Sequence, residues 1–109
     1  MDASEPIPEI GTRLLFENDR MRLWTMEVAP GDAWGPHEHH HAYVTVVAEP
    51  ARIASVMGDG TVELEIDAEV DRIDWHEAPA AGDRRVHTLE NRGNTFYKNF
   101  IIELLEPPR

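Results

Sequence analysis

Short runs of alternating apolar and polar residues fill most of this 109-residue chain, and glycine, proline, asparagine or aspartate separates one run from the next. A period of two puts successive side chains on opposite faces of an extended strand, whereas helical periodicity is scarce. Many short strands with frequent turn residues are typical of a β-sandwich or barrel. The sequence therefore predicts an all-β protein of about eight strands: Thr12–Phe16, Met21–Ala29, His39–Ala48, Arg52–Met57, Thr61–Ile66, Val70–His76, Val86–Glu90 and Thr95–Leu105.

Two local features bear on how these strands are connected. The run Gly58-Asp59-Gly60 is a strong signal for a tight turn between two strands. The apolar residues between positions 62 and 70 share one parity, whereas Ile73 and Trp75 take the other. A bulge or bend near Asp71–Arg72 would reconcile the two patterns.

Length and charge narrow the class of protein. A chain of 109 residues with 41% hydrophobic content predicts a single domain over residues 1–109, with ends at 1–10 and 106–109 that are mobile or contact a second subunit. A formal net charge of −11 and a single lysine argue against nucleic-acid binding. The N-terminus does not resemble an export signal, and no apolar run is long enough to cross a membrane, so we expect a cytoplasmic protein without membrane contact.

The densest group of potential metal ligands lies between Gly31 and Tyr43, in the stretch GDAWGPHEHHHAY. Residues at i and i+2 of a strand project from one face about 7 Å apart, so the imidazoles of His37 and His39 can converge on one ion. A third ligand must come from another strand, and His87 is the candidate. The alternatives are a solvent-exposed loop that binds metal adventitiously and imidazoles that hydrogen-bond within a core. Because the chain has no cysteine, any ion is held by nitrogen and oxygen donors.

Glycines, histidines, a proline and an asparagine recur in two motifs, at Gly31, His37, His39, Pro79, Gly82, His87 and Asn91. These two motifs resemble those of the cupin superfamily. The stretch FENDRMRLWTMEVAPG, which ends at Gly31, is similar to the opening of small single-domain bacterial cupins associated with β-alanine degradation. The resemblance runs from about Thr12 to Leu105. It implies a double-stranded β-helix, that is, a jelly-roll barrel, with His37, His39 and His87 as metal ligands, and it implies a homodimer.

This chain has Tyr43 where the first cupin motif has a glutamate ligand. If one strand ran through the cluster, alternation would put His37, His39, His41 and Tyr43 on one face. Tyr43 is then either an outer-sphere partner that hydrogen-bonds a bound water or an aromatic lining of the barrel mouth. His41 could replace the glutamate as a fourth ligand, unless a kink after the second histidine turns it outward. Tyr43 and His41 are thus the candidate catalytic residues.

Three neutral imidazoles leave coordination positions open, as catalysis requires, and suit one divalent ion of Zn, Ni, Fe, Mn or Cu. We expect His76 to lie on the surface and Glu103 to pair with a polar neighbour such as Lys98. Apolar side chains should wall a pocket beside the ion, and the candidates are Trp24, Met26, Trp34, Trp75 and Phe100.

The leading functional hypothesis is metal-dependent chemistry on a small oxygenated organic acid or a related metabolite. The ion would act as a Lewis acid or activate dioxygen, so a dioxygenase, an isomerase and a decarboxylase all fit. The alternative is a non-catalytic module that binds or senses a small molecule, because a fold does not determine a function. A third possibility is a purely structural barrel whose histidines hold no ion.

Overall fold

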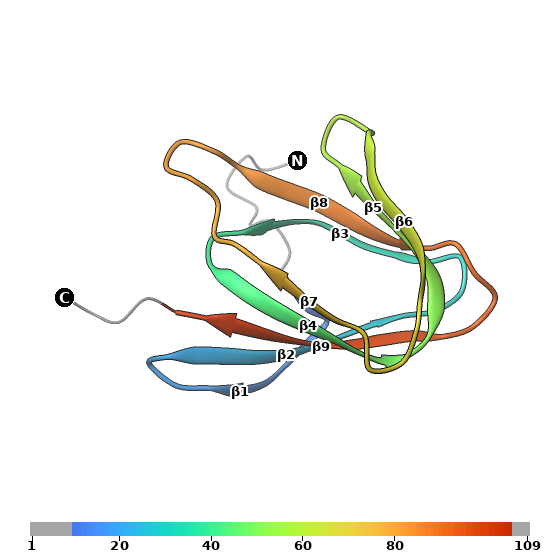
Figure 1. Ribbon diagram of the computed structural model, residues 1–109, viewed down its shortest axis with the longest axis horizontal. Helices are drawn as coiled ribbons and strands as arrows, with labels where there is room; N and C mark the ends of the chain where they lie inside the picture. The colour runs from blue at the N-terminus through green and yellow to red at the C-terminus, as the bar shows by residue number, and fades with distance from the viewer. Residues whose placement is uncertain (1–9, 106–109) are drawn as a thin grey trace, which may run out of the picture.

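The computed structural model describes residues 10–105, which form nine β-strands and no helix. The strands are β1 (Arg13–Glu17), β2 (Met21–Val28), β3 (Ala33–His39), β4 (Ala42–Glu49), β5 (Ala51–Met57), β6 (Val62–Ala68), β7 (Ile73–His76), β8 (Arg85–Asn91) and β9 (Tyr97–Leu104). Sheet A has the strand order β1-β2-β9-β4-β7, and sheet B has the order β3-β8-β5-β6. Figure 1 shows β8 and β3 above, β9 and β2 below, and β5 and β6 closing one side.

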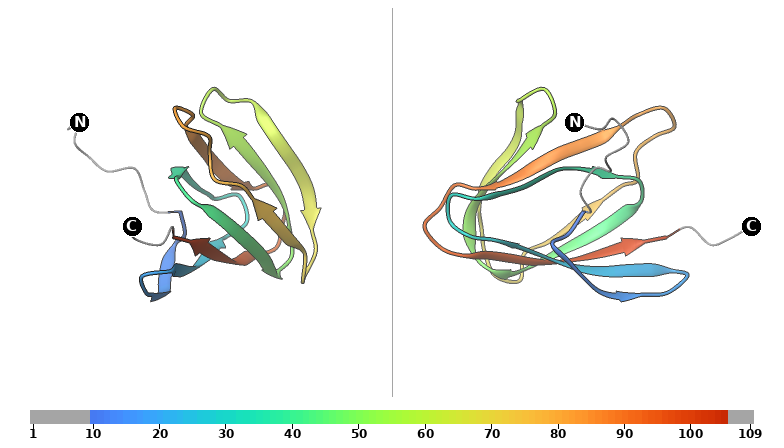
Figure 2. Two further views of the ribbon diagram at one scale, coloured as in Figure 1. Left: turned by 60° about the vertical axis from the view of Figure 1, so that its left-hand side comes forward. Right: turned by 180° about the vertical axis from the view of Figure 1, so that it is seen from behind.

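The two sheets face each other, and every strand pairing within them is antiparallel. Both views in Figure 2 show sheet B curving around to meet sheet A. The all-β prediction is confirmed. The described residues also contain no helix that is long and apolar enough to span a membrane.

The ninth strand is β3, because the sequence predicts no strand over residues 33–38. The predicted strand His39–Ala48 corresponds to β4, but it begins later, at Ala42 in sheet A, because His39 is the last residue of β3 in sheet B. The chain turns through His40 and His41. Period-two alternation alone could not reveal this change of sheet, because polar residues that turn the chain look like the exposed face of a strand.

The predicted strand Val70–His76 begins later than expected, at Ile73. A turn precedes it, in which the Arg72 amide donates to the Glu69 carbonyl at 3.2 Å and Asp71 has a φ of 69°. This turn is the bend that the parity change predicts near Asp71–Arg72. The predicted chain ends fall mostly outside the described residues, at 1–9 and 106–109, and Ile10 is buried in the core.

A bulge in β3 directs the histidines inward. Trp34 pairs with Leu89 and His37 pairs with His87, so β3 has one more residue than β8 between these two pairs. Trp34 packs against the core and His37 is 1% exposed, although an odd separation would put them on opposite faces of a regular strand. Gly35 lies at this bulge with a φ of 136°. The bulge thus lets Trp34 and His37 face the same interior.

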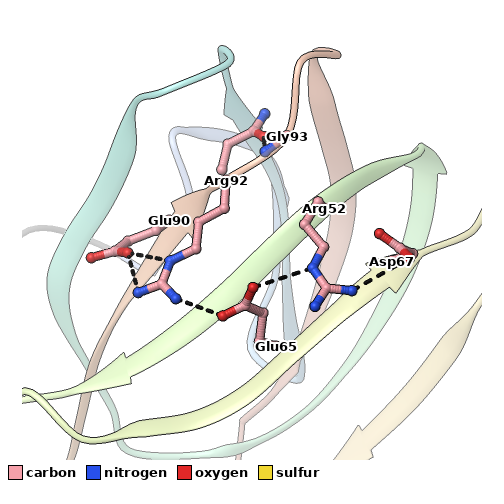
Figure 3. A network of polar contacts seen from close by, with 7 residues as sticks. Arg52, Glu65, Asp67, Glu90, Arg92 and Gly93 are labelled. Carbon is pink, nitrogen blue, oxygen red and sulfur yellow. Dashed lines mark hydrogen bonds and ion pairs between the residues drawn. The ribbon is translucent and has the colours of Figure 1, made fainter.

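The outer faces of the two sheets differ in character. Arginines and carboxylates cover much of sheet B's outer face in a network of ion pairs, which Figure 3 shows for Arg52, Glu65, Asp67, Glu90 and Arg92. The outward positions of sheet A are instead mostly apolar. The apolar ones include Phe16, Leu23, Val44, Val46, Ile73, Trp75, Phe100 and Ile102, and the register aligns them in rows across five strands.

Candidate metal centre

The three predicted ligands come together in the structure. His37 and His39 project from β3, and His87 projects from the neighbouring strand β8, directly opposite His37. One ring nitrogen of each lies within 4.8 Å of the others, and the Nε2 atoms of His39 and His87 are 2.9 Å apart. Two nitrogens bound to one ion at about 2.1 Å and at right angles would be about 3.0 Å apart. The separation therefore suits adjacent positions on a metal ion.

Burial keeps these imidazoles neutral. His37 and His39 are 1% and 2% exposed. Burial is the main cause that lowers the pKa of His37 to about 3 and that of His39 to about 2, and neighbouring imidazoles lower both further. The pKa of His87 is also lowered, chiefly by burial, although the Glu63 carboxylate opposes the shift. Neutral imidazoles are the form that binds a metal ion.

Several of these nitrogens have no regular hydrogen-bond partner among residues 10–105. They are both ring nitrogens of His37 and the Nδ1 atom of His39. The Trp34 backbone is near enough to His37 to oppose part of its pKa shift, but it does not meet regular hydrogen-bond geometry. A buried polar atom without a partner is destabilising, so such atoms call for an explanation. A metal ion bound by the three rings would satisfy one nitrogen of His37. The donor set fits a divalent transition metal, because three imidazoles without a carboxylate or thiolate suit Zn, Ni, Cu or Fe.

Ser55 and Glu63 fix the orientation of the third ligand. Ser55 Oγ donates to Glu63 Oε1 at 2.6 Å, and His87 Nδ1 lies 2.6 Å from Ser55 Oγ and 3.2 Å from Glu63 Oε1. Burial raises the pKa of Glu63, but hydrogen bonds from Ser55 and His87 outweigh burial and lower it overall, so Glu63 is ionised. An ionised carboxylate only accepts, so Nδ1 of His87 is the protonated nitrogen and Nε2 keeps its lone pair. Carboxylate partners of this kind orient metal-binding histidines in proteins.

Sequence reasoning missed Glu63 because a bulge changes its direction. Ser55 pairs with Leu64 and Val56 pairs with Val62, so Glu63 is an extra residue in β6. The parity of β6 predicts that Leu64 faces inward and Glu63 outward, yet both side chains line the interior cavity. No signal in the sequence marks this bulge, so Glu63 could not be predicted. Ser55 could have been, because it shares the parity of the buried Ile53 in β5, and a polar residue among core-facing positions indicates a possible site residue.

Tyr43 lies between two histidine rings. It stacks on His39 with a centroid distance of 4.0 Å and on His76 at 4.3 Å, with the rings nearly parallel in both pairs. Tyr43 is 4% exposed, and burial raises its pKa above the usual phenol range, so the phenol stays protonated. The expectation that His76 lies on the surface is wrong. His76 pairs with Tyr43 across β7 and β4, and it lines the cavity.

His41 does not join the metal-binding group. It lies in the turn between β3 and β4, so the alternation that aligns it with His39 and Tyr43 is broken. It is half-buried and does not line the cavity. The chain therefore kinks after His39 and turns His41 outward, which was the alternative to a fourth ligand at this position. His41 is therefore excluded as a fourth ligand by its position.

A cavity of about 120 Å³ lies between the sheets beside the three histidines. Most of the surface exposed to the cavity is apolar, although twelve of its twenty lining residues are polar and come from both sheets. The polar side chains are the three histidines with Tyr43, Thr45, Ser55, Glu63, Arg72, Asp74, His76, Tyr97 and Asn99. The space suits a small molecule whose polar groups meet defined partners.

Of the five predicted pocket residues, Met26 lines this cavity and four do not. Trp24 is buried in the core and donates through Nε1 to Glu103, which also bonds Arg22 and does not pair with Lys98. Trp34 is half-buried and packs against the core.

The other two predicted pocket residues point away from the interior. Trp75 is 53% exposed and donates to Glu77 on the surface. Phe100 lies on the outer face of β9 beneath the Lys98 ammonium, because Asn99 and Ile101 take the inward positions. The prediction for Trp75 and Phe100 is wrong because alternation shows that two faces exist without showing which one is inside.

Comparisons with known proteins place the fold in a known class. No protein-family model matches the chain, and no curated protein matches it in sequence. Among solved structures, a cupin domain from Bordetella pertussis Tohama I superposes with a TM-score of 0.72 at 17% identity, covering 85% of this chain and 90% of that one. An RmlC-like cupin family protein with a double-stranded β-helix fold from Methanocaldococcus jannaschii has a TM-score of 0.66 at 7% identity, with coverages of 98% and 95%.

A third similar structure is the polyketide cyclase RemF from Streptomyces resistomycificus. Its TM-score is 0.58 at 20% identity, and the match covers 84% of this chain but 59% of the cyclase. These likenesses show a common fold. The chain has the double-stranded β-helix of cupin domains, as its sequence motifs imply. The association with β-alanine degradation finds no support in these comparisons.

Proposed function

We propose that this chain is a metal-dependent enzyme that binds one divalent transition metal through His37, His39 and His87 and acts on a small oxygenated organic acid. The convergence of three neutral, buried imidazoles on one side of a cavity carries the proposal. All three histidines line the cavity, and no cysteine, aspartate or glutamate of residues 10–105 joins their group. This arrangement leaves room for a substrate, whereas a structural site is closed by a fourth protein ligand.

The bound ion would supply Lewis acidity or a site for dioxygen activation. The chain's own residues would do the rest. Ser55 and Glu63 hold the His87 ring, and the apolar walls exclude water from the substrate. The Tyr43 phenol, which stays protonated, faces the cavity beside His39 and would donate a hydrogen bond to a substrate oxygen. We do not assign His41 a role, because it lies outside the cavity.

A cyclase among the proteins of similar fold supports an enzymatic role, and the alternative is a module that binds or senses a metabolite without converting it. Short carboxylic acids of three carbons are the first substrates to test, because the N-terminal stretch resembles cupins associated with β-alanine degradation.

Metal content provides the first test. Protein purified without an affinity column and analysed by plasma mass spectrometry should contain about one transition-metal ion per chain. The variants His39→Ala and His87→Ala should lose the ion, whereas His40→Ala should keep it, because His40 is exposed in the turn. Equal metal content in all four proteins would contradict the assignment.

Product formation and oxygen uptake with the metal-loaded protein then separate enzyme from binder. A panel of three-carbon and longer carboxylic acids and aldehydes, followed by NMR, should reveal a product that depends on the ion. Binding of an acid without product in the metal-loaded protein would instead support the non-catalytic alternative.

A further inference from the structure

A second polar group lines the cavity. Asn99 of β9 is 3% exposed, and its Oδ1 atom has no hydrogen-bond partner within residues 10–105. Its Nδ2 atom donates to the Tyr97 hydroxyl at 2.9 Å, and Tyr97 is a second wall of the cavity. A buried amide oxygen without a donor is destabilising. Asn99 therefore marks a place where a bound molecule can supply a missing donor.

Strand register places Asn99 at the opposite end of the cavity from the histidines. On β4, Tyr43 stacks on His39, whereas Val47 is the residue paired with Asn99. Four residues of strand extend over roughly 13 Å. The apolar walls include Met26, Val47, Ile66, Ala68, Leu89 and Ile101. The cavity is thus polar at its two ends and contains many apolar walls.

The end at Asn99 offers no uncompensated charge. Arg72 and Asp74 also line the cavity, and the Arg72 guanidinium donates to the Asp74 carboxylate at 2.7 and 3.1 Å. The Arg72 carbonyl accepts from the Val47 amide, which puts this ion pair at the same end. Since each charge already has its partner, recognition at this end depends on hydrogen bonds to a neutral group.

The hydrogen-bonding pattern selects the kind of neutral group. Asn99 Oδ1 needs a donor, and the Tyr97 hydroxyl accepts from Asn99 but keeps its own hydrogen for an acceptor. A hydroxyl both donates and accepts, whereas an ammonium group cannot accept and a carboxylate cannot donate.

We propose that Asn99 and Tyr97 form a subsite for the hydroxyl group of a short, straight-chain hydroxy acid whose carboxylate binds at the histidine end. This inference rests on the proposed metal-dependent function, because the bound ion would hold the carboxylate. It deepens that function by naming the substrate class: a molecule with two oxygen-bearing ends joined by a short hydrocarbon chain.

Calorimetry on the zinc-loaded protein tests the subsite. The probes are 5-hydroxypentanoate, compared with pentanoate, and 6-hydroxyhexanoate, compared with hexanoate. We expect the hydroxy acid that fits the cavity to bind about tenfold or more tightly than the alkanoate of equal length, because it satisfies a buried amide. Asn99→Leu should abolish this preference, and Asn94→Leu, at an exposed position in a turn, should retain it.

The outcomes separate this inference from the function on which it rests. Equal affinities for hydroxy acids and alkanoates in the native protein would overturn the proposed subsite. A buried water would then satisfy Asn99. The proposed metal site would not be affected by this result. If none of the four acids binds the zinc-loaded protein, both proposals fail. If Asn99→Leu does not fold, Tyr97→Phe keeps the ring and removes the hydroxyl, and an undiminished preference in that variant would overturn the proposal.

Discussion

At the scale of single residues, the proposed metal centre depends on side chains that are not themselves ligands. Ser55 and Glu63 hold Nδ1 of His87 and so leave Nε2 free to bind. Outer partners of this kind typically change metal affinity by about 10- to 100-fold when they are removed. Substitutions of Ser55 and Glu63 are therefore expected to change metal affinity measurably, although neither residue is a ligand.

We predict that Ser55→Ala and Glu63→Gln each weaken zinc binding by about 10- to 100-fold without abolishing it. The physical reason is that His87 loses its fixed tautomer and orientation. Competition titration with a chromophoric chelator measures the effect. Glu65→Gln is the matched control, because Glu65 lies on the same strand but pairs with Arg52 and Arg92 on the outer face (Figure 3). An affinity equal to that of the native protein in both variants would refute the role.

The ligands were predictable from the sequence, and their surroundings were not. The spacing of His37 and His39 and the position of His87 identify three residues that the fold brings together. Glu63 escaped prediction because a bulge reverses its direction, and His76 because only the pairing of β7 with β4 brings it beside Tyr43. Such contacts depend on register between distant strands, which a local pattern does not specify.

At the scale of elements, strand β3 was not predicted from the sequence, and the candidate site depends on it more than on any other strand. Its bulge at Gly35 turns His37 toward the cavity. A Cβ atom at Gly35 would lie 2.9 Å from the Thr88 Cα atom and 3.0 Å from the His87 carbonyl oxygen. The close packing of β3 on β8 at this point therefore requires glycine.

We predict that Gly35→Ala destabilises the protein by about 2 kcal/mol or more, because the backbone conformation is strained for any residue with a side chain and the added methyl group contacts β8. Chemical denaturation of the metal-free protein measures the change, and zinc affinity should fall as well. Gly58→Ala serves as the control, since a Cβ atom there meets nothing within 4 Å and its φ is not positive. A loss of stability equal to that of the control would show that the bulge tolerates a side chain.

At the scale of the whole molecule, the outer face of sheet A stands out because this acidic chain leaves it nearly free of net charge. Its outward positions are mostly apolar across five strands, and the charged exceptions are Arg13, Glu27, Glu49 and Lys98, of which Arg13 and Glu27 form an ion pair at 3.1 Å. Its five strands have 5, 8, 8, 8 and 4 residues, and strands about 4.8 Å apart with a rise of about 3.3 Å per residue then cover roughly 500 Å². This area is a little under two thirds of the roughly 800 Å² that each partner commonly buries in a stable complex.

We propose that a second copy of the chain covers this face, as the family resemblance implies. Two molecules that each carry a net charge of −11 repel each other least through surfaces of low net charge, and the strands of this face carry two outward cations and two outward carboxylates. Two curved sheets that pack face to face also form a closed twofold pair.

Light scattering should give twice the 12.4 kDa mass of one chain. We predict that Ile73→Glu, at a position 67% exposed on β7, halves this mass and leaves the fold intact, because the buried carboxylates would destabilise the pair. Val62→Glu, which is 42% exposed in sheet B, introduces the same charge away from the face and should leave the mass unchanged. A native protein that has the mass of a single chain would disprove the pairing.

The two sheets carry different parts of the candidate site, and this separation affects how the protein's selectivity could evolve. The proposed metal ligands and the side chains that orient them all belong to sheet B: His37, His39, His87, Ser55 and Glu63. The proposed hydroxyl subsite of Tyr97 and Asn99 belongs to sheet A, as do Tyr43 and His76. Mutations on one layer can therefore alter which molecule is chosen while the other layer preserves the reactive centre, so that selectivity and chemistry are free to evolve, or to be engineered, separately.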